Sequence, residues 1–199
     1  MDENTLEALA GRDLAVLEAM LAALPDYLTQ PELYYPLNNP DWPRLTIGGF
    51  LLRLRLVEAA YNRLDDSQRE AVQRILVRFN EIIHEYKAHL VQRVHAEFQA
   101  RLRQWRSYLD ELERYPREHA DFYKSEVENR LILQLLAEFL NSSQIDAANP
   151  DLPELESLDA HLAENWQQGD FILPRAVQSA YTGADDWWLY GQPDFPEPE

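Results

Sequence analysis

Apolar residues recur at helical spacing through the centre of the chain. Residues 67–115 contain neither glycine nor proline, and their apolar positions are separated by about 3.6 residues on average. This is the period of a straight α-helix, whereas a left-handed coiled coil requires about 3.5. A helix of this length would measure about 73 Å. We therefore predict one long central helix over about residues 67–115, with an apolar stripe at Val72, Ile75, Phe79, Ile82, Tyr86, Leu90, Val94, Phe98, Leu102, Trp105, Leu109 and Leu112.

Both ends of this helix carry recognisable signals. Ser67 and Glu70 have the spacing of a capping box, in which the serine hydroxyl and the glutamate carboxylate bond to free backbone amides. Tyr115 precedes Pro116, and a residue before proline is disfavoured in the α conformation. The helix is expected to begin and end at these positions.

Shorter amphipathic segments flank the long helix. The apolar patterns predict helices over about residues 4–24, 46–64, 117–140 and 151–168, and a proline- and tyrosine-rich loop over residues 25–45. The helices of residues 46–64 and 117–140 would cover about 28 Å and 36 Å of the long helix from its two ends. Short connections make both of them antiparallel neighbours. The predicted fold is an all-α, elongated antiparallel bundle built on one long central helix.

The C-terminal region is predicted to cover the bundle. Pro174 opens a short helical turn, and an aromatic cluster follows at Trp187, Trp188 and Tyr190. Residues 1–191 are expected to form a single helical domain. Residues 192–199 are acidic and rich in proline, which predicts a disordered tail.

The net charge of −17 is unevenly distributed. Residues 1–45, 46–115 and 116–199 carry −6, +2 and −13. This field repels phosphate backbones and anionic membranes, so we expect no nucleic-acid or membrane partner. The chain has no cysteine and no signal peptide pattern, and its longest strongly apolar segment, residues 47–64, carries four charged side chains, which predicts a cytoplasmic protein. No motif implies a cofactor.

One short motif has metal-ligand spacing. Glu81 and His84 form a Glu-x-x-His pair on one helical face, and Glu85 and His89 lie nearby. The carboxylate-bridged di-iron bundle needs this motif on two helices, and no second copy exists here. The step from His84 to His89 is also one residue too long for a His-Glu-x-x-His zinc site. These four residues remain metal candidates, with ordinary surface or core histidines as the alternative.

A polar cluster is expected midway along the long helix, where the two covering helices should meet. Its members are His84, Tyr86, His89, Arg93 and His95. A notch at this place would be a small-ligand site between helices. The alternative is a solvated seam.

Two further features have a functional and a structural interpretation. Gly48 and Gly49 at a helix start would let backbone amides approach an anion, or would permit close helix packing. Trp187, Trp188 and Tyr190 would form an exposed anchor for a partner, or would cover the protein's own core. Neither feature selects one interpretation.

The sequence predicts a binding role more readily than catalysis. No nucleophile motif is present, and paired acids such as Asp65 and Asp66 are common in so acidic a chain. A long apolar stripe needs to be covered, which favours a protein-interaction or scaffold module that self-associates as a homodimer. The alternative is a small-ligand-binding protein, a metal-binding protein or a metalloenzyme that uses the notch midway along the helix.

Overall fold

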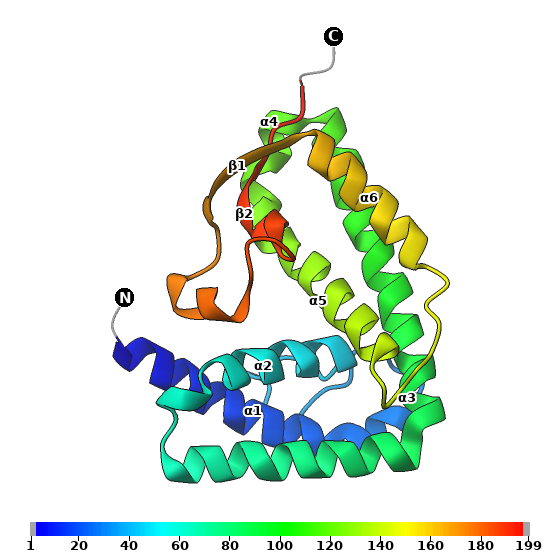
Figure 1. Ribbon diagram of the computed structural model, residues 1–199. Helices are drawn as coiled ribbons and strands as arrows, with labels where there is room; N and C mark the ends of the chain where they lie inside the picture. The colour runs from blue at the N-terminus through cyan, green and yellow to red at the C-terminus, as the bar shows by residue number, and fades with distance from the viewer. Residues whose placement is uncertain (1–2, 197–199) are drawn as a thin grey trace.

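The computed structural model describes residues 3–196, with side chains from Ala10 onward, and shows a bent assembly of helices (Figure 1). The prediction of an all-α fold on one long helix is confirmed. The α-helices are accompanied by a small sheet of two strands, β1 (Trp166–Phe171) and β2 (Tyr190–Pro193). They are also accompanied by short 3₁₀ helices: η1 (Tyr61–Arg63), η2 (Ala120–Phe122), η3 (Arg175–Ala180) and η4 (Trp187–Leu189). The helices are α1 (Glu3–Thr29), α2 (Ile47–Ala59), α3 (Asp66–Arg114), α4 (Pro116–His119), α5 (Tyr123–Asn141) and α6 (Leu152–Glu164).

The long helix α3 spans 49 residues, but it is not straight. The backbone of Tyr86 has φ −116° and ψ 22°, outside the helical region, and the helix turns a corner there (Figure 1). We call residues 66–85 the first arm and residues 87–114 the second arm. The prediction of a straight rod is therefore wrong. A single non-helical residue changes the direction of the axis while the apolar spacing continues on either side.

The bend allows short elements to cover the whole apolar stripe. Figure 1 shows α1 and α2 along the first arm and α5 and α6 along the second, and all four helices contact α3. Every stripe position is buried except Tyr86, which is half-buried at the corner. The stripe is thus covered within one chain, and one hydrophobic core runs through both arms.

The capping box of α3 lies two residues before the predicted one. Asp65 Oδ1 accepts a hydrogen bond of 2.8 Å from the Gln68 amide, and Gln68 Oε1 accepts one of 3.0 Å from the Asp65 amide. Asp65 is the N-cap, and Ser67 lies inside the first turn. Asp65 and Gln68 have the same spacing as the predicted pair, Ser67 and Glu70. The Asp65 carboxylate is the group that caps the helix.

The proline- and tyrosine-rich loop is ordered by contacts to its own flanks. Tyr35 and Leu45 pair as an isolated antiparallel bridge. The Tyr27 hydroxyl, at the end of α1, donates a hydrogen bond of 3.2 Å to the Leu33 carbonyl. The loop lies against helices, as its aromatic content suggested.

The C-terminal residues 165–196 form a strap that crosses the open side of the bend (Figure 1). β1 and β2 pair antiparallel, with Trp166 opposite Pro193. Within the predicted tail, β2 includes Gln192 and Pro193, and the Phe195 ring is buried against His161. Residues 197–199 lie outside the described part of the chain.

None of the helices within residues 3–196 is both long and apolar enough to cross a bilayer.

Candidate functional site

The predicted notch midway along α3 is not a closed site. His84 and His89 are exposed, and Tyr86 lies at the bend with its ring centroid 6.3 Å from that of His89. His95 is half-buried, and its Nε2 atom has no hydrogen-bond partner among the described residues. Arg93 serves the fold instead of a ligand. The predicted cluster is therefore divided between the solvent-exposed corner and the packing around α1.

Arg93 holds the end of α1 and the following loop against the second arm. Its guanidinium donates to the carbonyl oxygens of Tyr27 at 3.2 Å, Pro31 at 3.2 Å and Glu32 at 3.4 Å. It also lies 5.1 Å from the centroid of the Tyr27 ring. Tyr27 belongs to the last turn of α1, and Pro31 and Glu32 belong to the loop that follows, so Arg93 has a structural role.

The metal candidates do not converge. Glu81 forms an ion pair of 2.8 Å with Arg78, while His84, Glu85 and His89 are exposed around the corner. No group of three His, Cys, Asp or Glu side chains within residues 10–196 is arranged to hold a metal ion. The geometry adds no support to a metal site at Glu81, His84, Glu85 and His89.

The aromatic cluster at Trp187, Trp188 and Tyr190 covers the protein's own core. Trp188 is 3% exposed, and its ring stacks on the Arg130 guanidinium at 3.8 Å. Trp187 packs edge-on against Trp166, and the Tyr190 hydroxyl donates to the Tyr181 carbonyl. These contacts favour the interpretation as a cover for the core, with Trp188 buried and Trp187 and Tyr190 half-buried.

Gly48 and Gly49 do bring a backbone amide to an anion, but that anion belongs to the same chain. The Gly48 amide donates a hydrogen bond of 2.9 Å to Oε2 of Glu97, which is fully buried on the second arm. Glu97 Oε1 accepts a bond of 2.8 Å from Arg101 Nε. The glycine also allows close packing, since an added Cβ would lie 2.1 Å from the Ile132 side chain.

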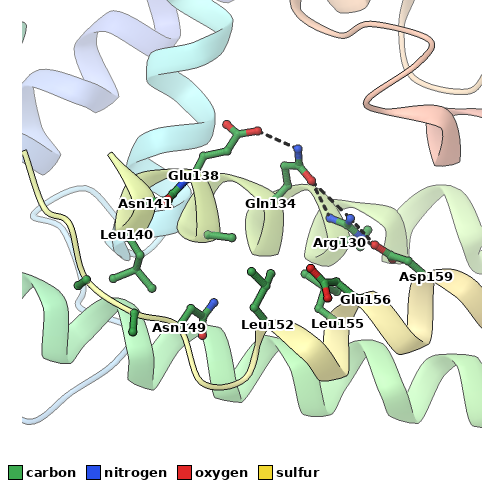
Figure 2. Close-up of a pocket in the computed structure, with 13 residues that line it drawn as sticks. Arg130, Gln134, Glu138, Leu140, Asn141, Asn149, Leu152, Leu155, Glu156 and Asp159 are labelled. Carbon is green, nitrogen blue, oxygen red and sulfur yellow. Dashed lines mark hydrogen bonds and ion pairs between the residues drawn. The ribbon is translucent and has the colours of Figure 1, made fainter. Parts of the chain in front are cut away.

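The polar pocket of interest lies between α5, α6 and the loop that joins them (Figure 2). It has a volume of about 450 Å³, and Leu140, Leu152 and Leu155 form its apolar floor. Ligand pockets of about 300–1,000 Å³ with a few placed polar groups are common between helices. We call this the α5–α6 pocket. Its polar lining consists of Arg130, Gln134, Glu138, Asn141, Asn149, Glu156 and Asp159.

The only arginine in this lining is already neutralised. Arg130 Nε and Nη2 donate to the two carboxylate oxygens of Asp159 at 2.7 and 2.5 Å. Its side chain is only 4% exposed, and the Trp188 ring covers it. A forked pair of this kind joins α5 to α6 and leaves little charge for a ligand.

Other polar groups of the α5–α6 pocket are still open to a ligand. Glu156 is exposed and forms no ion pair or hydrogen bond with any described residue. Asn149 Nδ2 is buried without a hydrogen-bond partner in the described chain. Glu138 binds Gln134 Nε2 at 2.8 Å and keeps half of its side chain exposed. Figure 2 shows Asn149 and Glu156 beside the leucines of the floor, whereas Glu138 extends from the other side of α5.

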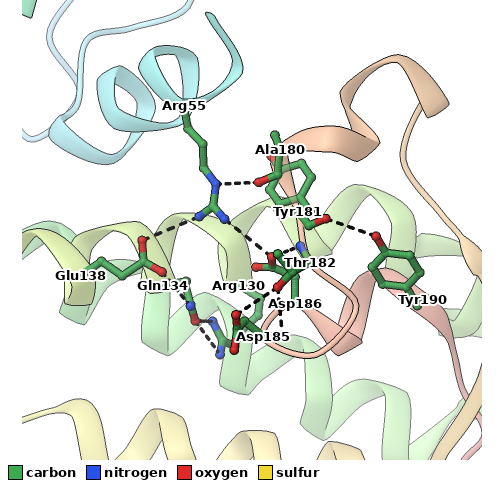
Figure 3. Close-up of polar contacts among 10 residues, drawn as sticks. All are labelled: Arg55, Arg130, Gln134, Glu138, Ala180, Tyr181, Thr182, Asp185, Asp186 and Tyr190. Carbon is green, nitrogen blue, oxygen red and sulfur yellow. Dashed lines mark hydrogen bonds and ion pairs between the residues drawn. The ribbon is translucent and has the colours of Figure 1, made fainter. Parts of the chain in front are cut away.

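A polar chain continues from the α5–α6 pocket to the strap (Figure 3). Arg55 of α2 lies 3.7 Å from Glu138 and 3.6 Å from Asp186, and its Nε donates to the Ala180 carbonyl at 3.0 Å. Asp186 is 1% exposed and accepts a bond of 2.9 Å from the Thr182 amide. Arg55 therefore fixes the strap to α2 and α5, and it places Glu138 at the pocket edge.

The sequence contained a weak signal for this pocket. Gln134 and Glu138 are four residues apart in an otherwise apolar stretch, so they share one face of α5. The distant partner of Glu138, Arg55, lies on α2, and the contact to α6 is made by Arg130 through Asp159. The spacing marks a polar face but does not show that a second helix stands opposite to it.

Comparisons with known proteins gave no relative. No family model matches this chain, and searches of curated proteins and of solved structures found no significant similarity. The geometry of the pocket is therefore the basis for a functional proposal.

Proposed function

We propose that this chain is a non-enzymatic protein-interaction module that receives a basic side chain of a partner protein in the α5–α6 pocket. The observation that carries the proposal is the unpaired Glu156 carboxylate beside an apolar floor of three leucines. Lysine and arginine have the matching shape, because an apolar stem carries a cationic head. The stem would lie along Leu152 and Leu155, and the head would reach Glu156.

The charge of the whole chain supports the same partner. Residues 116–199, which include both helices of the pocket, carry −13 of the total −17. Such a field raises the local concentration of cations and accelerates the encounter with a basic segment. It also disfavours acidic partners.

A second copy of this chain, the homodimer that the sequence suggested, has less support than a different protein. That suggestion depended on an uncovered apolar stripe, and α1, α2, α5 and α6 cover it. The exposed large apolar side chains within residues 10–196 are Val77, Tyr115 and Phe122, which is little surface for a stable dimer. We expect sedimentation and light scattering to show a monomer.

The α5–α6 pocket is tested with a matched pair of small probes. N-acetyl-arginine-methylamide and its neutral citrulline counterpart have nearly the same shape and differ in charge. We expect the arginine probe to shift the side-chain amide signals of Asn141 and Asn149 in a saturable NMR titration. The citrulline probe should bind about threefold more weakly, because a partly exposed ion pair contributes about 0.2–1 kcal/mol.

Two variants with the same charge change provide the control. Glu156→Gln removes the unpaired pocket carboxylate, whereas Glu164→Gln removes an exposed carboxylate of the same helix outside the pocket. The proposal expects weaker arginine binding in the first variant and an unchanged affinity in the second. Equal losses would mean that the general acidic field attracts the probe, and the proposed site would be abandoned.

A further inference from the structure

A second cavity lies on the other side of α5, where the strap meets α1 and α2. It measures about 450 Å³ and is bounded by α1, α2, the start of α5 and residues 173–181. In Figure 1 the corresponding segment of the strap, η3, comes down beside α1 and α2. We call it the strap cavity. It shares no residue with the α5–α6 pocket.

The walls of the strap cavity are mainly apolar. Leu52 and Leu56 of α2, Leu131 of α5 and Val177 of η3 line it, and the buried Tyr181 ring adds an aromatic wall. The Tyr181 hydroxyl forms no hydrogen bond with any residue that the structure describes. An apolar chain placed here would be removed from water on several sides, which is favourable in proportion to the area buried.

One cation stands at the strap cavity. Lys124, in the first turn of α5, is exposed and has no ion pair within residues 10–196. Two acids also line the cavity. Asp13 is 3.9 Å from Arg53, and burial raises the pKa of its carboxyl group. Glu128 is exposed one turn after Lys124.

We propose that the strap cavity binds a medium-chain fatty acid, with the alkyl chain between α2 and η3 and the carboxylate at Lys124. The apolar walls favour the alkyl chain, and Lys124 is the one cationic side chain among the lining residues that can pair with a carboxylate head, whereas Asp13 and Glu128 repel it. The Tyr181 hydroxyl offers the carboxylate a second donor. This inference is independent of the proposed protein partner, because the two sites have no residue in common.

The alkyl part of the proposal is tested by calorimetric titration of the whole chain with hexanoate, octanoate and decanoate. We expect the affinity to rise about fourfold for each added methylene until the cavity is filled. Leu56→Trp should abolish binding by filling the cavity. Leu51→Trp is the matched control, since this half-buried leucine of the same helix lies outside the cavity.

The role of the head group is tested with the two lysines of the chain. Lys124→Gln should weaken decanoate binding about threefold, as expected for a partly exposed ion pair, and leave decanol binding unchanged. Lys87→Gln, an exposed change on α3 away from the cavity, should alter neither. Both lysine variants are surface changes, so they test the proposal even if Leu56→Trp does not fold. The absence of decanoate binding, or equal effects of the two lysine variants, would overturn the proposal.

Discussion

The Gly48 amide donates a hydrogen bond of 2.9 Å to the Glu97 carboxylate across the interior of the bend. Gly48 lies in the first turn of α2, and Glu97 lies on the second arm of α3. The positive end of the α2 dipole and the adjacent Arg101 both stabilise this buried negative charge. The contact joins the short helix of one arm to the other arm, so it helps to hold the corner.

Replacing Gly48 should loosen this contact. In Gly48→Ala the new Cβ would lie 2.1 Å from Ile132 Cγ2 and 2.8 Å from Glu97 Oε1, so α2 must move away. We expect a loss of about 1–3 kcal/mol in the free energy of unfolding, measured with urea. Gly11→Ala is the control. Gly11 lies inside α1, and an added Cβ would meet only Gln68 of α3, at 3.7 Å, so we expect the Gly11→Ala variant to be as stable as the original protein or more stable.

Removing the charge of Glu97 should be more costly. Glu97→Gln leaves the Arg101 guanidinium, which is 10% exposed, without its carboxylate, and breaking a buried pair costs about 3 kcal/mol. The measurement is urea unfolding. Glu81→Gln removes the exposed partner of Arg78 on the same helix and should leave the midpoint unchanged. Similar losses in both variants would show that Glu97 is not effectively buried.

The bend itself predicts a short distance between the two arms. The chain has no cysteine, so a variant with Ser67→Cys and Ser107→Cys would carry spin labels at these two positions alone. Both positions are exposed. A straight helix would separate these backbone positions by about 60 Å. We expect a clearly shorter distance by pulsed electron resonance. The control pair, Ala88→Cys and Ser107→Cys, lies within the second arm and should give the straight-helix value of about 28 Å.

Alkaline pH should destabilise the fold through its buried tyrosines. Burial raises the pKa of Tyr27, Tyr108, Tyr123 and Tyr181, that of Tyr181 to about 12. An unfolded tyrosine ionises near pH 10, so the unfolded state releases protons first and the folded state is penalised as pH rises. For Tyr181, the stability that comes from its raised pKa is fully present below about pH 10 and is lost as the pH rises from about 10 to 12.

Urea unfolding at pH 8, 10 and 11, together with tyrosinate absorbance, measures this effect. Each buried tyrosine contributes at most about 1.4 kcal/mol per pH unit. Tyr181→Phe should reduce the slope of stability against pH, and Tyr115→Phe, which changes an exposed ring, should not. A stability that is flat from pH 8 to 11 would contradict the burial of these hydroxyls.

The positions of the helices were largely accessible from sequence, whereas the bend was not. The apolar residues from Val72 to Leu112 predicted α3 because helix period is a local property of the chain. Tyr86 has no proline or glycine beside it, so nothing local marked it as the corner. Its conformation depends on α1 and α2 packing on one arm and α5 and α6 on the other.

The candidate pocket was also predicted only in part from the sequence. The spacing of Gln134 and Glu138 was visible in the sequence, and so was the stripe that forms α6, but the position of Glu156 in the same pocket was not. The sequence predicted a site around His84 because its histidines are close together in the chain. They lie on a convex corner, where neighbours in sequence diverge toward solvent.

The sequence alone determined the helical class, the length of α3 and the acidic character of the C-terminal half, because periodicity and charge are read from neighbouring residues. The tertiary structure decided the corner at Tyr86, the burial of Glu97 against Gly48 and the walls of both cavities. Each of these depends on contacts between residues far apart in the chain. Such contacts are set by the packing of the whole core and leave no periodic trace in any one segment.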